Sequence, residues 1–191
     1  DAVKAGDLPG NIAAVISNKA GVKGLERAEK AGISTEVLDH RPFPDRESYD
    51  RELQQLIDSH SPKLVVLAGF MRILSAGFVD HYQGRLINIH PSLLPLFKGL
   101  DTHQRALEDG VKKHGASVHF VTADLDGGPV IVQARVPVLA DDTAEVLQQR
   151  VLVQEHRLYP LAIKWIAEGR VELRNHQVYL DSNPLQQIPA F

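Results

Sequence analysis

The sequence predicts an α/β protein in which a mostly parallel sheet is flanked by helices, with an antiparallel strand pair near the C-terminus. Short β-branched or apolar runs alternate with longer segments of helical periodicity, which is the pattern of βαβ units. The run at 63–68 is apolar on both faces, as a central parallel strand covered by helices should be. In such a sheet the crossovers are right-handed, and ligands bind beyond the carboxyl ends of the strands.

The N-terminal part of the chain repeats a strand–helix unit. Residues 11–17 form a β-branched run that predicts a strand, and the helix formers of 24–30 follow it before a glycine stop. Residues 34–38 predict a second strand. Asp45 is the expected N-cap of a helix over 46–60, in which apolar residues recur at helical spacing. The strand–helix unit therefore occurs twice before the central apolar strand.

The rest of the chain continues this alternation and ends in a ribbon. The tight turn D-G-G-P at 126–129 separates two strands. Thr143 caps the longest helix, with Pro160 inside it and Gly169 as its stop. The elements expected after the central strand are a short helix over 75–81, a strand over 85–90, a helix over 102–109, strands over 116–122 and 130–138, a helix over 143–168, and ribbon strands over 171–173 and 178–180.

Length and composition favour one globular domain that acts on small molecules. The chain has 191 residues, of which 43% are hydrophobic and 24% charged, as in an ordinary soluble domain. Its 21 basic and 24 acidic residues give a net charge of −3 and are scattered, which argues against a nucleic-acid partner. The longest apolar run, 64–71, is too short to span a membrane. The absence of cysteine excludes disulfides and thiolate chemistry, and we expect a cytoplasmic monomer or homodimer.

Polar or ligand-suited residues concentrate at three predicted strand ends. The first, 69–74, combines a glycine that lets backbone approach a ligand with apolar side chains suited to a flat ring. At the second, Asn88 and His90 share one face because side chains alternate along a strand. The third is the strand over 117–121, on which Ser117 and His119 face one way, with its sequel over 124–129, which contains Asp126. Each has an ordinary structural alternative: an aliphatic loop, a half-exposed strand end and a common Asp-Gly turn, respectively.

An amide, an imidazole and a carboxylate that meet in a crevice fit acyl transfer without a covalent nucleophile. Asn88 and protonated His90 can donate hydrogen bonds to the oxyanion of a tetrahedral intermediate, each worth about 3–4 kcal/mol when preorganised. Asp126, if it approaches His90, favours the protonated imidazole. The attacking group then comes from a second substrate, for instance an amine. The motifs H-E-x-x-H, G-x-S-x-G and G-x-G-x-x-G do not occur, and no metal is expected.

Four separate segments resemble the folate-dependent formyltransferases. They are A-G-F-M-R-I-L at 68–74, N-I-H-P-S-L-L-P at 88–95, H-G-A-S-V-H-F-V at 114–121 and L-D-G-G-P-V at 125–130. The resemblance covers nearly the whole chain, in order. It implies a Rossmann-like formyltransferase fold. It also implies transfer of the formyl group of 10-formyltetrahydrofolate, a co-substrate, to the amine of a second small molecule, glycinamide ribonucleotide.

The resemblance further implies roles for individual residues. Asn88, His90 and Asp126 match the family's catalytic trio, with His90 as the proton donor that Asp126 keeps protonated. Arg46 and Arg72 match positions facing the folate's glutamate carboxylates, although from the residues alone both are ordinary solvated charges. The implied folate-binding residues are Arg46, Met71, Arg72, Ile73, Leu74, Asn88, Thr122, Ala123, Asp124, Leu125 and Asp126. The implied ribonucleotide-binding residues are Leu152, Val153, Gln154 and Glu155, the last otherwise an exposed helix carboxylate.

Two departures from the family pattern are visible. Family members begin with a strand and a G-x-G-S-N turn that binds the ribonucleotide phosphate at a helix N-terminus, and this sequence starts after that region. We therefore expect a single domain over 1–191 that lacks this strand and turn, and a biological polypeptide about 20 residues longer. Ala123 stands where an acidic residue is usual. The alternatives are another folate-dependent formyltransferase, such as one acting on methionyl-tRNA, a formyltetrahydrofolate hydrolase, and a non-catalytic α/β ligand-binding protein.

Overall fold

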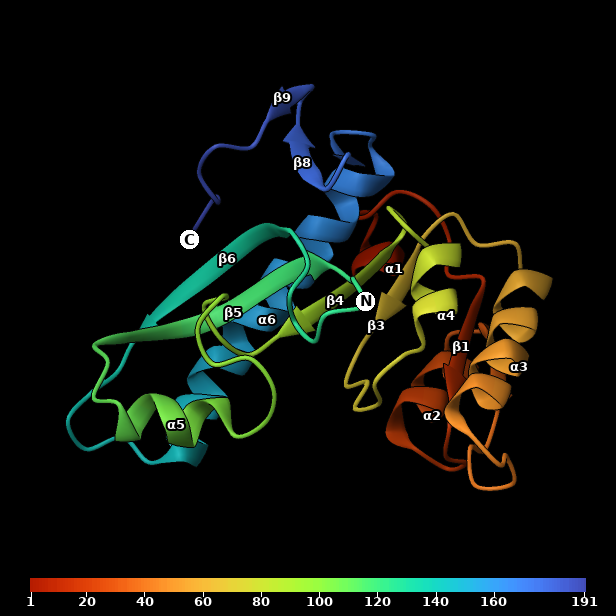
Figure 1. The fold of residues 1–191 in the computed structure, drawn as a ribbon, viewed down its shortest axis with the longest axis horizontal. Coiled ribbons are helices and arrows are strands. Elements are labelled where there is room, and N and C mark those ends of the chain that lie inside the picture. Colours follow the sequence, from red (N-terminus) through yellow and green to blue (C-terminus); the bar gives the residue numbers. More distant parts are fainter.

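The computed structural model describes residues 1–191 and confirms the α/β class (Figure 1). Every strand and helix expected above is present, and the structure adds a short first helix, α1, and a short last strand, β9. The helices are α1 (Ala2–Ala5), α2 (Lys23–Lys30), α3 (Arg46–Ser59), α4 (Ala76–His81), α5 (Thr102–Glu108) and α6 (Ala144–Ala167). The strands are β1 (Ala14–Ser17), β2 (Ser34–Val37), β3 (Val65–Leu67), β4 (Leu86–His90), β5 (Lys113–Phe120), β6 (Val130–Pro137), β7 (Val171–Arg174), β8 (Gln177–Leu180) and β9 (Asn183–Pro184).

The strands are hydrogen-bonded in three groups. β1 pairs with β2 in parallel, and β3 pairs with β4 in parallel. β5 and β6 extend the β3–β4 pair in antiparallel orientation, giving the order β3-β4-β5-β6. The predicted C-terminal ribbon forms as β7, β8 and β9. β1 and β3 each pair with one strand only, so each keeps one unpaired edge.

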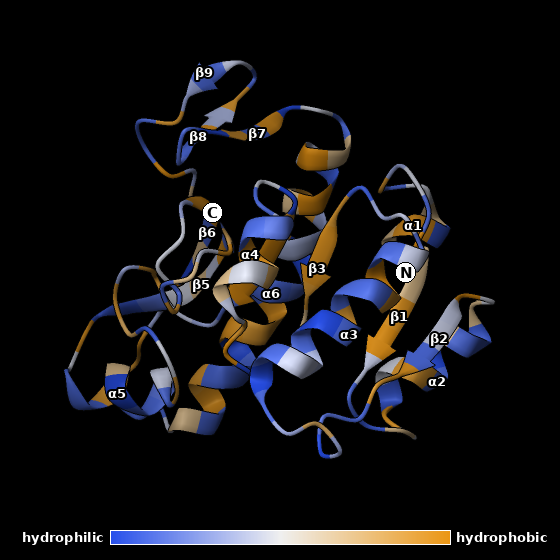
Figure 2. Ribbon diagram, turned by 45° about the vertical axis from the view of Figure 1, so that its right-hand side comes forward, coloured by the Kyte–Doolittle hydropathy of each residue, from blue (hydrophilic) through white to orange (hydrophobic).

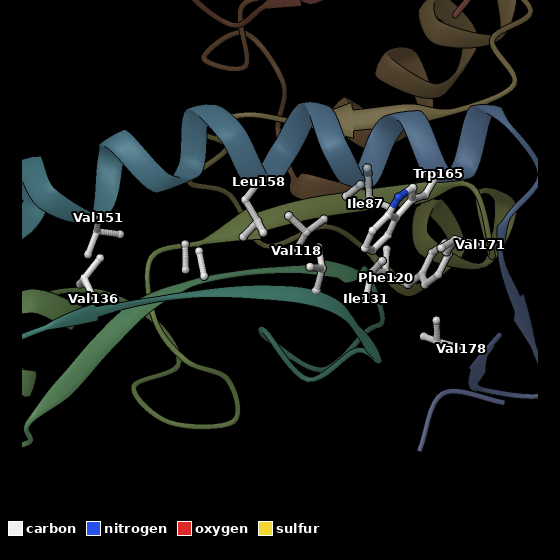
Figure 3. Close-up of a cluster of buried hydrophobic side chains, with 14 of the residues drawn as sticks. Ile87, Val118, Phe120, Ile131, Val136, Val151, Leu158, Trp165, Val171 and Val178 are labelled. Carbon is white, nitrogen blue, oxygen red and sulfur yellow. The ribbon is translucent and has the colours of Figure 1, made fainter. Parts of the chain in front are cut away.

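Helix α6 packs on the four-stranded sheet and organises the larger core (Figure 3). As predicted, Thr143 caps it by accepting a hydrogen bond from the N–H of Val146, and it stops at Glu168 before Gly169. Pro160 lies inside the helix. The helix therefore presents a continuous apolar stripe to the sheet. The fully buried members of this core are Ile87, Ala106, Ala116, Val118, Val132, Leu147, Val151 and Ala162.

A smaller core joins α3 and α4 to the parallel strands. The Asp45 carboxylate accepts a hydrogen bond of 2.7 Å from the N–H of Ser48, so the predicted N-cap of α3 is confirmed. Figure 2 shows α3 as largely hydrophilic and β3 as hydrophobic. The prediction of a central strand covered on both faces was wrong for β3, because it lies at the edge of its sheet and Val66 is 39% exposed. The buried residues of this core are Tyr49, Leu53, Ile57, Val65, Leu74, Phe78, Val79, Tyr82 and Leu86.

Tyr159 connects α6 to both parallel strands, β3 and β4. Its hydroxyl lies 2.6 Å from the carbonyl oxygen of Leu67, at the end of β3, and 3.1 Å from that of Ile87, near the start of β4. Burial raises the pKa of this phenol well above its usual range, so the hydroxyl keeps its proton and donates. One polar group therefore links the helix to the two strands.

His114 makes the fold sensitive to acid. It lies on β5 with no exposed surface, neither ring nitrogen has a hydrogen-bond partner, and the His103 ring is 5.1 Å away. Burial, followed by the nearby His103, lowers the pKa of His114 from 6.5 to about 4. Between about pH 6.5 and 4, His114 is protonated in the unfolded chain and neutral in the folded chain. The free energy of unfolding is therefore highest above about pH 6.5 and falls as the pH drops toward 4.

We expect His114→Phe to remove most of this loss, which is on the order of 3 kcal/mol. The measurement is urea unfolding of the parent and the variant at neutral pH and at about pH 4. The parent should lose more free energy of unfolding than His114→Phe between the two conditions. Equal losses in both proteins would show that His114 is not the acid-sensitive group.

Candidate active site

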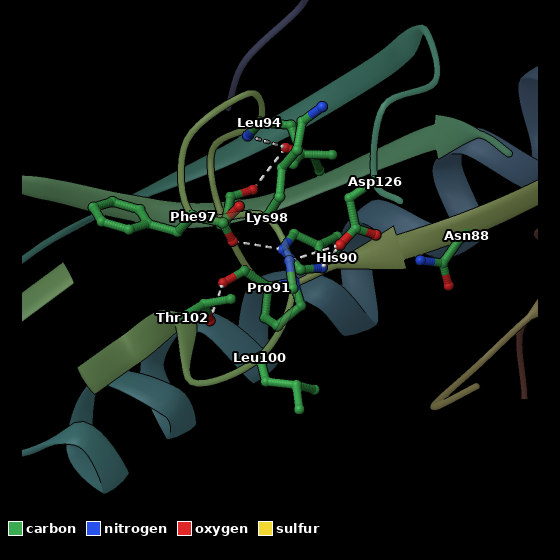
Figure 4. A network of polar contacts seen from close by, with 12 residues as sticks. Asn88, His90, Pro91, Leu94, Phe97, Lys98, Leu100, Thr102 and Asp126 are labelled. Carbon is green, nitrogen blue, oxygen red and sulfur yellow. Dashed lines mark hydrogen bonds and ion pairs between the residues drawn. The ribbon is translucent and has the colours of Figure 1, made fainter. Parts of the chain in front are cut away.

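Three segments that are distant in the sequence meet beyond the end of β4. The antiparallel register places Asn88 opposite His119 of β5, while the loop between β5 and β6 returns Asp126 to the same place (Figure 4). Nδ1 of His90 lies 3.4 Å from Oδ2 of Asp126, and the two side chains are only 7% and 9% exposed. Asp126 has a left-handed backbone, with φ of 47°, which is uncommon for a residue other than glycine. The structure therefore brings the predicted imidazole and carboxylate within ion-pair distance.

The two ring nitrogens of His90 have different partners, which assigns their roles. Nε2 lies 2.9 Å from the carbonyl oxygen of Phe97. Because a carbonyl only accepts hydrogen bonds, Nε2 carries a proton, and Nδ1 is the nitrogen that gains or loses one. Nδ1 faces Asp126, whose Oδ2 also accepts a hydrogen bond of 2.9 Å from the N–H of Gly99. Nδ1 is therefore the nitrogen available for proton transfer.

His119 orients the amide of Asn88. Nδ1 of His119 lies 2.9 Å from the carbonyl oxygen of Phe120 and so carries the proton, leaving Nε2 as an acceptor. Nδ2 of Asn88 donates to this Nε2 at 3.4 Å. Burial lowers the pKa of His119, which keeps the ring neutral, and its Nε2 is 3.7 Å from Oδ1 of Asp126. Since an amide nitrogen has two hydrogens, Asn88 keeps one for a ligand.

The sequence placed His119 at the third candidate strand end but assigned it no role in the site. The signal was present, because Ser117 and His119 alternate along one strand and so share a face. The information that was missing is the pairing of β5 with β4, which sets His119 opposite Asn88 and Ser117 opposite His90. Cross-strand register depends on the whole sheet, so one segment alone does not reveal it.

A cleft adjoins these residues, and its walls are the segments predicted for the folate. The exposed fractions of Ile73 and Leu125 are 57% and 54%, and next to the cleft Met71 is 74% exposed. Large exposed apolar side chains beside buried polar groups are typical of a ligand site. The residues lining the cleft are Leu67, Phe70, Arg72, Ile73, Leu74, Asn88, His119, Val121, Thr122, Ala123, Asp124, Leu125 and Asp126.

The two predicted arginines lie in different surroundings. Arg72 lines the cleft, and its guanidinium stacks 4.7 Å above the ring of Tyr49. Its Nε is buried without a hydrogen-bond partner. Arg46 does not line the cleft and pairs with its neighbour Glu47 at 3.1 Å, with both side chains largely exposed. The structure brings Arg72 to the other site residues and does not bring Arg46 there.

The segment predicted to hold the ribonucleotide lies on α6. Burial raises the pKa of Glu155, which is half-buried, whereas Val153 is 55% exposed. Glu155 precedes Tyr159 by one helical turn and shares its face. Since the Tyr159 hydroxyl reaches the carbonyls of Leu67 and Ile87, Glu155 lies one helical turn from the contact of α6 with β3 and β4. Leu152 and Gln154 flank it on the helix.

No group of three or more histidine, aspartate and glutamate side chains is placed to hold a metal ion. None of the helices combines the length and the apolar character needed to cross a membrane.

The chain is similar to known proteins over most of its length. A family model described as formyl transferase matches residues 1–163. The phosphoribosylglycinamide formyltransferase of Escherichia coli (strain K12) is 56% identical over 185 residues, covering 97% of this chain and 87% of the relative. A solved structure of the phosphoribosylglycinamide formyltransferase from Coxiella burnetii, in complex with CHES, has a TM-score of 0.94 and 51% identity, covering 100% of this chain and 90% of that one. This chain belongs to the formyl transferase family.

Proposed function

We propose that this protein transfers the formyl group of 10-formyltetrahydrofolate to the amine of 5-phosphoribosylglycinamide, a step of de novo purine (IMP) biosynthesis. The similarity to phosphoribosylglycinamide formyltransferases supports this choice of substrates. The observation that carries the chemistry is the contact of 3.4 Å between Nδ1 of His90 and Oδ2 of Asp126. Formylfolate acts as a co-substrate in this reaction. Residues 1–191 belong to a single domain. The protein acts in the cytoplasm as a monomer or homodimer.

The reaction begins when the amine nitrogen attacks the formyl carbon. A new carbon–nitrogen bond forms, and the formyl oxygen becomes an oxyanion. The free hydrogen of the Asn88 amide and the proton on Nδ1 of His90 are the groups that donate to this oxyanion. Because both donors are already oriented by other residues, little reorganisation is needed in the transition state.

The tetrahedral intermediate collapses when the bond between the formyl carbon and N10 of the folate breaks. N10 takes up a proton as it leaves, and the attacking amine loses one, so protons balance. His90 and Asp126 are the pair that moves this proton, since Nδ1 can carry it and the adjacent carboxylate stabilises the charged ring. The products are tetrahydrofolate and the formylated amide.

The remaining residues are assigned to binding. The pterin lies against the exposed apolar side chains of the cleft, where Ile73 and Leu125 adjoin the buried polar groups. Arg72, and Arg46 from α3, face the glutamate carboxylates of the folate. Glu155, with Leu152, Val153 and Gln154, holds the ribonucleotide. The buried and unpaired Nε of Arg72 is a donor with capacity for such a carboxylate.

The direct test supplies the protein, isolated from its own organism, with 10-formyltetrahydrofolate and one acceptor at a time. We expect glycinamide ribonucleotide to gain one formyl group in the mass spectrum, with stoichiometric formation of tetrahydrofolate. Formylation of methionyl-tRNA instead would identify a different acceptor. Release of free formate without any acceptor would identify a hydrolase, and binding without turnover a ligand-binding protein. Any of these three results would contradict the proposal.

Asp126→Asn tests the role of the carboxylate. The asparagine can still accept the hydrogen bond from Gly99, but it has no charge to stabilise the protonated His90 ring. We expect turnover to fall about 100-fold and the alkaline limb of the pH–rate profile to move to lower pH. Asp80→Asn, on the exposed side of α4, is the control and should leave both unchanged. An unaltered pH profile in Asp126→Asn would count against the pairing.

A further inference from the structure

A single loop, residues 92–99, supplies both backbone groups that orient the reacting pair. The carbonyl oxygen of Phe97 accepts a hydrogen bond of 2.9 Å from Nε2 of His90. The N–H of Gly99 donates to Oδ2 of Asp126 at 2.9 Å. If this loop shifts, both the tautomer of His90 and the direction of Asp126 change together. The position of the loop is therefore a condition for the geometry of the site.

The backbone of this region is strained and does not hold itself in place. Phe97 and Asp101 have φ of 53° and 55°, in the left-handed region that favours glycine. Asp126 on the facing loop has φ of 47°. Such a backbone conformation is unfavourable for a residue with a side chain and persists where surrounding contacts fix it. The contacts that fix the loop thus matter for the site.

Arg105 holds the far part of the loop by donating to the carbonyls of Lys98 and Leu100. The contacts at its near part, next to β4, converge on two buried residues, Ser117 and Gln133. The Ser117 hydroxyl donates to the carbonyl of Ser92 at 2.7 Å and accepts from the N–H of Leu94 at 3.0 Å. Nε2 of Gln133 donates to the carbonyl of Leu94 at 2.9 Å and to the Ser117 hydroxyl at 2.9 Å. Ser117 has no exposed surface, and Gln133 is 5% exposed. We call these two residues and their four hydrogen bonds the Ser-Gln clamp.

The clamp lies in register with the reacting histidine. His90 of β4 is paired with Ser117 of β5, which is paired with Gln133 of β6. The three residues form one row across the sheet, so the loop that leaves β4 after His90 is fastened two strands away. The side chain of Gln133 makes no hydrogen bond to His90 or Asp126. Its Nε2 donates only to the Leu94 carbonyl and the Ser117 hydroxyl.

We propose that Gln133 is a positioning residue for the formyl transfer: through Ser117 and Leu94 it fixes the loop whose backbone sets the His90 tautomer and orients Asp126. The proposal rests on the function proposed above. Removing the Gln133 amide would leave the buried carbonyl of Leu94 without a hydrogen-bond donor. It would also remove the hydrogen bond that the Ser117 hydroxyl accepts from Gln133. The loop then relaxes away from its strained conformation.

The test is Gln133→Met, which keeps the length of the side chain and removes its donor. We expect kcat to fall on the order of 10- to 100-fold, because small displacements of catalytic groups have effects of that size. KM for both substrates should stay within about 2-fold of the parent's values. Gln133 does not line the cleft, and it does not lie on α6, the helix assigned to the ribonucleotide. The alkaline limb of the pH–rate profile should move to lower pH, as in Asp126→Asn.

Val132→Ala is the matched control. Val132 is the neighbouring residue on β6, has no exposed surface and belongs to the apolar core. It should lower the melting temperature at least as much as Gln133→Met while leaving the pH profile in place. Equal changes in kcat and pH profile for the two variants would overturn the proposal. If Gln133→Met does not fold, Ser117→Ala removes the centre of the Ser-Gln clamp and should give the same kinetic signature.

A second readout separates this proposal from the proposed function. Nitrogen NMR of the His90 ring reports which nitrogen carries the proton, without any turnover. In the parent protein we expect the proton on Nε2, and in Gln133→Met a mixture of both tautomers. A parent protein without formyl transfer would refute the function alone. An unchanged tautomer in Gln133→Met would refute the positioning role alone.

Discussion

Replacing His90 with alanine is expected to lower turnover by about 10²- to 10⁴-fold, the range for losing a general acid that also stabilises an oxyanion. The ring is nearly buried and faces Asp126 at 3.4 Å, so no other group occupies its place. Binding of formylfolate, measured by calorimetry, should change only a few-fold, because the apolar walls of the cleft remain. Turnover is measured as formation of tetrahydrofolate under saturating substrates.

His81→Ala is the control for the His90 variant. His81 also pairs with a carboxylate, since its Nε2 lies 2.9 Å from Oδ2 of Asp58, but this pair lies on α3 and α4, away from the cleft. We expect full turnover in His81→Ala. If His90→Ala kept more than about a tenth of the parent's turnover, His90 would be excluded as the proton donor.

Gly128→Ala is expected to have the largest effect on stability. A Cβ at this position would lie 1.8 Å from the carbonyl oxygen of Phe120, a backbone atom of the facing strand. The two strands are hydrogen-bonded here, with the N–H of Phe120 donating to the carbonyl of Pro129 at 3.0 Å, so neither side yields easily. We expect a loss of more than about 3 kcal/mol in the free energy of unfolding, measured with urea. The loop that carries Asp126 shifts as well, and turnover falls with it.

Gly24→Ala is the matched control for Gly128→Ala. Gly24 lies in α2, and a Cβ there meets no atom within 4 Å. Alanine should stabilise the helix by up to about 1 kcal/mol, an effect of the opposite sign. The two substitutions add the same methyl group, so the difference between them measures the close approach of the strands. Similar stabilities for both variants would show that the hairpin tolerates the Cβ.

The fold could be predicted from local signals because most of its elements have them. Asp45 and Thr143 are helix caps in the sequence and accept the expected hydrogen bonds in the structure. The alternation that puts Asn88 and His90 on one face follows directly from strand geometry. The strand β9 had no such signal, because the turn before it places Asp181 and Ser182, rather than glycines, in the left-handed region.

The candidate site could be predicted only in part, for a physical reason. Side chains such as His90 and Asp126 are visible in a sequence, whereas the backbone groups of Phe97 and Gly99 that orient them depend on a strained loop. Part of the hold on that loop comes from Ser117 and Gln133, whose positions are set by strand register. The resemblance to a family suggested candidate residues for ligand contact, and it suggested none that would act through other residues.

The hydroxyl of Tyr159 reinforces the pairing of β3 with β4 from the side of helix α6. One phenol lies within hydrogen-bond distance of the carbonyls of Leu67 and Ile87, so spreading the two strands would break one of these contacts. Leu67 also lines the cleft, so this contact steadies the backbone of one of its walls. Changes in the shape of the cleft therefore have to come from its loops.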